Sequence, residues 1–349
     1  MPRALDSHAG TRYTRLTFRH HVYFEETFLN LFIKVACTAA TAFGLATTAL
    51  AQGPAIPKVI KIVVPFSPGG SNDLFARALG QRLATALNTT VVVDNKPGAG
   101  GAIGAVAVSQ AEADGSTLLL TSVSFVTNAA IQEKPAYDPV KSFAPVALLN
   151  RGPMLLIVGK DTPYTTTAQV VQAMRNNKNT NYGSAGVGSI GQMATELLNA
   201  MSQANATHIP YKGISNAVTD MMGGNLQMMI TTAASVTGPL KANQVRPVAV
   251  TSIKRSRFMP ELPTISEVVP GFDVESWWGV YAPPKTPGPL VDKLNAEIRK
   301  IADSAAMREL FERESTEPGT LDARQFAAYV ADESAKWRKL AAARGIKSE

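Results

Sequence analysis

Short apolar segments bounded by turn residues alternate with helical patterns through most of this chain. The first four are VIKIVV (59–64), TVVVDN (90–95), STLLLTS (116–122) and APVALLN (144–150). Segments of this kind are typical of buried parallel strands, whose two faces are covered by helices. Because parallel strands need crossover connections, the spacing predicts an α/β fold built from right-handed βαβ units.

The middle of the chain repeats this alternation, which predicts a second α/β lobe. Its expected strands are residues 154–159, 179–184, 207–211, 226–231 and 246–252. Segments around 150–159 and 272–284 are expected to run from one lobe to the other and back, so that the C-terminal helices complete the first lobe. These helices have two apolar stripes, Leu290, Leu294, Ile298 and Ile301 in one and Phe326, Val330, Trp337 and Leu340 in the other. The predicted boundaries are 52–153 with 278–349 for lobe 1, and 154–277 for lobe 2.

The first 51 residues have the pattern of a secretory signal peptide. Lys34 precedes an apolar run from Val35 to Leu50, and Ala49 and Ala51 occupy the small-residue positions of a cleavage site. A transmembrane anchor is the alternative, but the run is shorter than the roughly 20 residues that a bilayer requires. The polar stretch over residues 1–30 exceeds a normal signal and indicates a start codon downstream of Met1. We therefore expect an exported protein.

The composition excludes several kinds of chemistry. Five of the 34 basic and three of the 27 acidic residues precede residue 52, which leaves a net charge of +5 in the predicted mature chain. The single cysteine and three of the four histidines also lie in that segment, so His208 alone remains. Such a chain cannot form a disulfide or a zinc site built from His and Cys. We expect no metal, no cofactor and no nucleic-acid partner.

Two glycine-rich turns each join a predicted strand to a predicted helix. The first lies in VVPFSPGGSNDLFARALG (63–80), and its helix is expected to bury a stripe of Leu74, Ala78 and Leu83. The second is YGSAGVGSIGQM (182–193). Backbone N–H groups at helix N-termini bind anions, so the pair predicts capture of a carboxylate between the lobes. Alternatively, glycine serves only tight turning and serine only caps the helix.

Other interpretations of the second turn fit less well. Gly186, Gly188 and Gly191 spell the dinucleotide pattern GxGxxG, but the next strand lacks the acidic residue that holds the ribose. Ser189 and His208 are candidates for a hydrolase pair, although Val187 stands where a nucleophile elbow requires glycine. Neither turn carries the lysine and hydroxyl residue of a Walker sequence. The pattern therefore favours a binding protein over an enzyme.

Seven segments, in order, carry a resemblance to one known family. They are VPFSPGGSNDLFAR (64–77), VVVDNKPGAGGAIGA (91–105), YDPVKSFAPVALL (137–149), NYGSAGVGSIGQ (181–192), HIPYKGISNAVTDMMGGNLQMM (208–229), RPVAVTSIKRSRFMPELPTISE (246–267) and GFDVESWWGVYAPPKTP (271–287). From Lys58 to its end, the chain resembles the substrate-binding receptors of tripartite tricarboxylate transporters, the Bug family of periplasmic proteins.

The resemblance implies a two-lobed periplasmic binding protein of type II, a Venus flytrap in which each lobe is a β-sheet flanked by helices. It further implies a receptor without catalytic activity that holds a small carboxylate ligand, partly through ordered water, and delivers it to membrane transporter subunits. A periplasmic sensing receptor that signals to a sensor kinase is the alternative. We expect a monomer, because no coiled-coil seam is present.

By position, the family's ligand-binding residues correspond to Phe66, Ser67, Gly69, Gly70, Asp73, Ser122, Gly183, Ser184, Gly186, Gly188, Ser189, Gln192 and Thr231. Asp73 is expected to fix its loop rather than to contact the ligand, and Lys212 and Trp277 are further candidates for lining the site. Family members commonly have histidine at the position of Gln192 and aspartate at that of Thr231. The loss of that aspartate predicts an acid without a cationic group.

Overall fold

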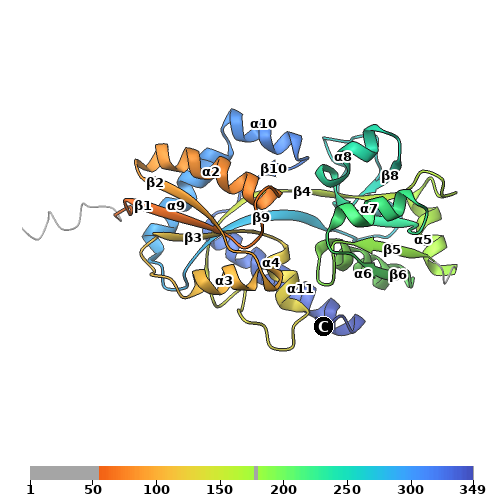
Figure 1. The fold of residues 1–349 in the computed structure, drawn as a ribbon, viewed down its shortest axis with the longest axis horizontal. Helices are drawn as coiled ribbons and strands as arrows, with labels where there is room; N and C mark the ends of the chain where they lie inside the picture. Colours follow the sequence, from red (N-terminus) through yellow and green to blue (C-terminus); the bar gives the residue numbers. More distant parts are fainter. Residues whose placement is uncertain (1–54, 177–179, 349) are drawn as a thin grey trace, which may run out of the picture. The chain divides into compact units, whose positions relative to one another are not determined.

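The described strands form one mixed ten-stranded sheet, in the order β2-β1-β3-β9-β4-β7-β5-β6, with β10 and β8 also paired to β4 (Figure 1). Their bounds are β1 (Val59–Val64), β2 (Thr90–Asn95), β3 (Thr117–Ser122), β4 (Ala144–Gly159), β5 (Asn181–Ser184), β6 (Thr207–Pro210), β7 (Met228–Thr232), β8 (Val245–Val250), β9 (Glu275–Ala282) and β10 (Glu317–Pro318). The computed structural model describes residues 55–176 and 180–348. The predicted signal peptide lies outside the described residues.

Helices connect these strands and cover both faces of the sheet. They are α2 (Ser71–Leu87), α3 (Ala102–Ser109), α4 (Ser124–Ala130), α5 (Thr167–Asn176), α6 (Ile190–Ser202), α7 (Ile214–Met222), α8 (Ala233–Lys241), α9 (Gly288–Ala302), α10 (Ala305–Arg313) and α11 (Ala323–Arg344), with short 3₁₀ helices η1 (Ala99–Gly101) and η2 (Ile265–Glu267). Within the described part of the chain, none of them combines the length and apolar character needed to cross a bilayer.

The sheet consists of two parallel halves joined by antiparallel strands. In the first half, β2, β1 and β3 are parallel, and in the second half so are β6, β5 and β7. The prediction of a parallel strand at 144–150 is wrong, because this segment of β4 is antiparallel to β9. The two strands connect the halves in opposite chain directions, and they can therefore pair only in the antiparallel sense.

One strand, β4, belongs to both halves of the sheet. Its residues 144–153 pair with β9, ending at Pro153 opposite Glu275. Its residues 154–158 pair with β7, beginning at Met154 opposite Thr232. The two strands expected at 144–150 and 154–159 are thus a single strand of 16 residues. No turn separates them, and the exchange of partners occurs between Pro153 and Met154.

The core is divided by the sheet into clusters on its two faces. In the first half, α2, α9 and α10 cover one face, where Phe75 packs edge-on against Trp278 and Phe311. On the other face, α3, α4 and α11 share a cluster that continues into the second half under α6. In the second half, α7 and α8 cover the opposite face.

The apolar stripes of the helices were predicted with mixed success. The stripe expected for α2 is wrong at Leu74, which is 40% exposed, whereas Leu83 is buried as expected, together with Phe75 and Leu79. The helix meets the sheet one residue further round than the apolar pattern indicated, since the larger Phe75 packs inward. The two C-terminal stripes are confirmed by burial of Leu290, Leu294, Ile298 and Ile301 in α9, and of Phe326, Val330, Trp337 and Leu340 in α11.

The last long helix, α11, contacts both halves of the fold. Its Glu333 is buried and accepts hydrogen bonds from the indole N–H groups of Trp277 (3.2 Å) and Trp337 (3.0 Å). Near its end, Arg344 Nε lies 2.8 Å from Glu196 Oε2 of α6. The helix therefore ties the crossing strand β9 to the second half of the fold.

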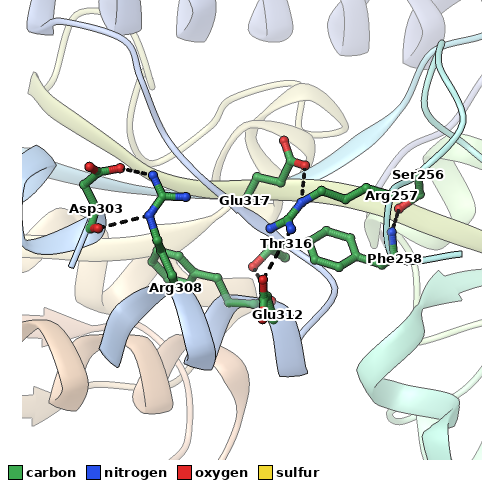
Figure 2. Close-up of polar contacts among 9 residues, drawn as sticks. Ser256, Arg257, Phe258, Asp303, Arg308, Glu312, Thr316 and Glu317 are labelled. Carbon is green, nitrogen blue, oxygen red and sulfur yellow. Dashed lines mark hydrogen bonds and ion pairs between the residues drawn. The ribbon is translucent and has the colours of Figure 1, made fainter. Parts of the chain in front are cut away.

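A second polar link joins the segment after β8 to the C-terminal region (Figure 2). Arg257 Nε lies 2.9 Å from Glu317 Oε1 in β10, and its Nη1 lies 3.3 Å from Glu312 Oε1 in α10. The guanidinium also lies 4.4 Å from the ring centroid of Phe258. All three charged side chains are about half exposed, so each pair contributes at most about 1 kcal/mol.

The close packing of β9 on α11 predicts the effect of one substitution. A Cβ at Gly279 would lie 2.4 Å from Phe326 Cζ and 3.1 Å from Tyr281 Cε2. We expect Gly279→Ala to lower the free energy of unfolding by about 1–3 kcal/mol, measured by urea denaturation, because both rings are buried and must shift.

Gly238→Ala is the matched control, since a Cβ there would meet nothing within 4 Å and the residue lies in α8. Helix propensity predicts a gain of up to about 1 kcal/mol for this variant. Equal effects of the two substitutions would contradict the packing argument.

Candidate functional site

The carboxyl ends of both sets of three parallel strands face the region where β4 and β9 pass from one half of the sheet to the other. We call this region the crossing. Ser122, at the end of β3, pairs with Trp278, and Thr232, at the end of β7, pairs with Met154. Ligands of open parallel sheets bind beyond the carboxyl ends of the strands. The two glycine-rich turns follow β1, which is parallel to β3, and β5, which is parallel to β7, so the carboxyl ends of β1 and β5 face the same region from opposite sides. The topology therefore brings both turns to the region of the crossing.

The first loop, residues 65–70 between β1 and α2, is held by side chains from α2 and β2. The Gly69 N–H donates to Asp73 Oδ2 (3.0 Å), and Asn95 Nδ2 donates to the Phe66 carbonyl (3.1 Å). Arg77 joins both supports, with Nε 3.0 Å from Asp73 and Nη2 3.2 Å from Asn95 Oδ1. Asp73 thus fixes the loop, whereas Ser67, Gly69 and Gly70 are exposed.

The second loop, residues 185–189 between β5 and α6, is held in a similar way. The Gly188 N–H donates to the buried Gln192 Oε1 (2.7 Å), and the Gly186 N–H donates to Ser184 Oγ (3.1 Å). Ser189 is the N-cap of α6 and donates its hydroxyl to the Gly186 carbonyl (2.7 Å). Gly186 and Gly188 have φ values of 121° and 78°, a region that favours glycine.

These contacts change the expected source of anion binding. The N–H groups of Gly69, Gly186 and Gly188 already have acceptors within the chain. The amides of a helix's first turn, by contrast, have no intrahelical acceptor. In this fold they belong to residues 71–72 of α2 and 190–191 of α6. The glycines shape the turns, and the following residues present the donors.

Asn128 of α4 connects the two loops. It was not among the predicted site residues, because no sequence motif includes it. Its Nδ2 donates to the Gly100 carbonyl (2.7 Å), and a Cβ at Gly188 would lie 2.7 Å from its Oδ1. The neighbouring Gly101 packs against the first loop, because a Cβ there would lie 3.4 Å from Phe66 Cζ. A continuous series of contacts therefore runs from the first loop through η1 and α4 to the second loop.

A cavity of about 650 Å³ lies beside this series of contacts. Its lining comes from η1, from α4 and the residues after it, from the second loop, from the end of β6 and the residues after it, and from the C-terminal end of the described chain. The lining residues are Ala99, Gly100, Asn128, Ile131, Gln132, Val187, Pro210, Tyr211, Lys212 and Ser348. Lys212 is the only charged side chain among these described residues, and none of them carries a carboxylate side chain. The lining includes Val187 of the second loop but no residue of the first.

The remaining predicted residues lie within strands. Ser122 is buried opposite Trp278, and Thr231 is buried in β7 opposite Leu155. Gly183 packs toward α7, because a Cβ there would lie 3.2 Å from the Cβ of Ala217. The expectation that Trp277 lines the site is wrong: its side chain is fully buried against α11.

The hydrolase alternative does not match the geometry. His208 Nε2 lies 2.7 Å from Ser184 Oγ, while the hydroxyl of Ser189 is used in capping α6 and in its bond to Gly186. Ser184 is completely buried, so its hydroxyl is not accessible to a substrate. Among the described residues, no three side chains of the His, Cys, Asp or Glu type are grouped as a metal site requires.

Comparison with known proteins identifies the class. A family model described as "Tripartite tricarboxylate transporter family receptor" matches residues 75–346. The protein BugT of Bordetella pertussis is 32% identical over 298 residues, which cover 84% of this chain and 91% of BugT. A structure from R. palustris with adipate has 33% identity and a TM-score of 0.73, covering 83% of this chain and 98% of that one. The structure of MatC from Rhodopseudomonas palustris, with bound malate, has 29% identity and a TM-score of 0.68, and the match covers 81% of this chain and 98% of MatC.

Two parallel half-sheets joined at a crossing, with helix N-termini directed toward it, define an α/β periplasmic solute-binding protein. The chain belongs to the tripartite tricarboxylate transporter receptor family, which includes the Bug proteins. This is a family of solute-binding receptors and not of enzymes. The family resemblance and the fold class inferred from the sequence are thereby confirmed.

The support of the first loop by Asp73 predicts a pH-dependent effect of its replacement. The hydrogen bonds from Arg77 and from the Gly69 N–H hold the pKa of Asp73 below its ordinary value of 3.8. Its stabilising contribution is therefore present above that value and is lost as the pH falls through the lower folded pKa. We expect Asp73→Asn to cost about 1 kcal/mol at pH 7, measured by urea unfolding, and less at an acid pH below 3.8, where the carboxylate becomes protonated.

Asp161→Asn serves as the control, because the Asp161 side chain is 85% exposed. It should change stability by no more than about 0.5 kcal/mol at either pH. A cost for Asp73→Asn that is equal at both pH values would contradict a role for the ionised carboxylate.

Proposed function

We propose that this receptor binds a small dicarboxylate between its first and second loops and delivers it to the membrane subunits of a tripartite tricarboxylate transporter. Secretion to the periplasm would use the N-terminal signal peptide predicted for residues 1–51, and the receptor would act as a monomer. The family's description as a transporter receptor supports delivery to a transporter over the alternative of signalling to a sensor kinase.

The observation that carries this proposal is the charge of the cavity beside the second loop. Lys212 is its only charged lining side chain among the described residues, and no described residue forms an ion pair with it. A cation without an ion-pair partner attracts a carboxylate, and Lys212 is exposed and therefore accessible to one. The volume of about 650 Å³ falls within the range of small-molecule sites.

Two carboxylates suit this arrangement better than one. One carboxylate would bind the first-turn amides of α2 and α6, where each favourable helix-terminus contact contributes about 0.3–2 kcal/mol. The second would reach Lys212. The relatives solved with adipate and with malate both hold dicarboxylates, which supports the same class for this chain. Thr231, at the position of the family's usual aspartate, supports an acid without an amino group.

We propose that the two lobes meet where β4 changes partners. Pro153 and Glu275 are the last pair in the first half, and Met154 begins the pairing with β7. Lobe 1 would then comprise residues 52–153 and 278–349, and lobe 2 residues 154–277. The stretch from Glu275 to Trp277 belongs to the crossing itself.

A thermal-shift and calorimetric screen tests the proposed function. We expect binding among succinate, malate, glutarate and adipate, with little response to butyrate, hexanoate, aspartate or glutamate. A bound acid at 100 times its Kd should stabilise the folded protein by about 2.7 kcal/mol. Absence of binding by all four dicarboxylates would overturn the proposal.

Matched glycine variants locate the binding region within the same screen. Gly70→Val places a side chain at the N-cap of α2, and Gly288→Val places one at the start of α9. A Cβ at either position meets nothing within 4 Å, so both variants should fold. We expect only Gly70→Val to weaken dicarboxylate binding, by about tenfold or more, since its branched side chain blocks the first-turn amides.

Replacing Lys212 tests the position of the second carboxylate. We expect Lys212→Met to raise the Kd of the bound dicarboxylate by about tenfold, because a charge-assisted hydrogen bond contributes about 1.5–3 kcal/mol. The flexible apolar stem is retained, so packing changes little. Calorimetric titration of the variant provides the measurement.

Lys241→Met, in the last turn of α8, is the control and should leave the Kd unchanged. An unchanged Kd in Lys212→Met would show that the second carboxylate binds elsewhere.

A further inference from the structure

His208 lies beneath the second loop and is hydrogen-bonded to the residue that supports it. It occupies β6, with Tyr182 of β5 as its register partner. The imidazole stacks on the Tyr182 ring with centroids 4.9 Å apart and planes 25° apart. Its Nε2 lies 2.7 Å from Ser184 Oγ, at the end of β5. The ring orientation is thus defined by one stacking contact and one hydrogen bond.

Ser184 transmits this contact to the loop. Its Oγ accepts the Gly186 N–H (3.1 Å) and lies 3.0 Å from the Gly186 carbonyl oxygen. When Nε2 of His208 carries no proton, the hydroxyl donates to it. When Nε2 is protonated, it donates to Ser184 Oγ, and the hydroxyl proton turns to the Gly186 carbonyl. The bond from Gly186 N–H to Ser184 persists in both cases, so protonation adds a charge without displacing the loop.

The charged groups around His208 come from three elements. On its own face of the sheet, Glu196 of α6 accepts the Tyr182 hydroxyl (2.6 Å) and Arg344 Nε of α11 (2.8 Å). On the opposite face, Asp220 of α7 is engaged by the Tyr211 hydroxyl. Burial lowers the pKa of His208 below its ordinary 6.5, and the charge of Glu196 opposes this in part. The ring is therefore mostly neutral at neutral pH.

We propose that His208 is a proton-linked positioning residue for the second loop: it orients Ser184 and thereby Gly186, and its protonation strengthens the binding of a carboxylate held by that loop. This inference rests on the proposed function, because it concerns the same binding region. It assigns a role to the one histidine that follows residue 51.

The physical basis is a charge interaction between the bound anion and the ring. The Ser184 hydroxyl lies 2.7 Å from Nε2 and 3.1 Å from the Gly186 nitrogen, so the ring would lie close to a carboxylate bound at the second loop. The bound carboxylate stabilises the protonated ring and so raises the affinity of His208 for a proton. By linkage, protonation of His208 raises the affinity for the carboxylate by the same factor. For each unit by which the ligand raises the pKa of His208, the affinity for the ligand is about tenfold higher at a pH below both the free and the ligand-bound pKa than at high pH.

Calorimetry of three full-length proteins tests the proposal, with succinate, malate, glutarate and adipate as probes. For the wild type, we expect the Kd to fall at least about threefold from pH 8 to pH 5.5, with proton uptake revealed by buffers of different ionisation enthalpy. His208→Gln keeps an amide nitrogen near the position of Nε2 and cannot titrate. It should bind as the wild type does at pH 8, without the tightening at lower pH.

His208→Leu separates the positioning role from the charge. It removes the hydrogen bond to Ser184, so its Kd at pH 8 should exceed that of His208→Gln by about fivefold or more. Protonation of the probes themselves affects all three proteins alike and cancels in the comparison. A Kd for His208→Leu equal to that of His208→Gln at pH 8 would overturn the positioning role.

An NMR titration makes the test independent of how well the variants fold. The Cε1–H resonance of His208 is assigned by its loss in His208→Gln, or by its low titration midpoint if that variant does not fold. We expect its pKa in the wild type to rise when the dicarboxylate saturates the protein. An unchanged pKa, or an equal pH dependence of Kd in wild type and His208→Gln, would overturn this inference and leave the proposed function standing. Absence of binding by every dicarboxylate at every pH would overturn the proposed function, and the inference with it.

Discussion

The antiparallel pairing of β4 with β9 is the interaction on which the rest of this structure depends. It continues from Ala144 opposite Ala282 to Pro153 opposite Glu275, and β4 then pairs with β7 without interruption. Because the same strand belongs to both half-sheets, the direction of each half is fixed relative to the other. That constraint places the carboxyl ends of both parallel triples, and the loops that follow them, on either side of one crossing.

Side chains then determine the form of these loops. Asp73 and Gln192, each early in the helix after its loop, accept the N–H of Gly69 and Gly188 respectively. Both are buried polar groups whose hydrogen-bonding capacity is used in the turn. Gln192 is a neutral group, so its hydrogen bond to the Gly188 N–H is independent of its protonation over a wide pH range. The loops therefore keep their shape without a ligand, which reduces the entropy lost on binding.

Much of the fold could be predicted from the sequence, because buried strands and the two long C-terminal stripes have strong apolar patterns. The direction of β4 could not, since a continuous apolar run reads alike in parallel and antiparallel pairing. The candidate site was predicted as far as its two turns, whose glycines are a local signal. Asn95 and Asn128 carry no such signal, because their roles depend on contacts with residues 29 and 28 positions away. Trp277 was misplaced for the same reason, since its partner Glu333 lies 56 residues further on.

The course of α11 has a consequence for exchanging parts between relatives. A chimera that replaced residues 154–274 would follow the boundary at which β4 changes partners, yet it would also change the surface beneath a helix encoded at the far end of the chain. Arg344 would then meet a foreign residue in place of Glu196. The second half of this receptor is thus not a transferable module, and recombination within the family must carry the C-terminal helix together with α6.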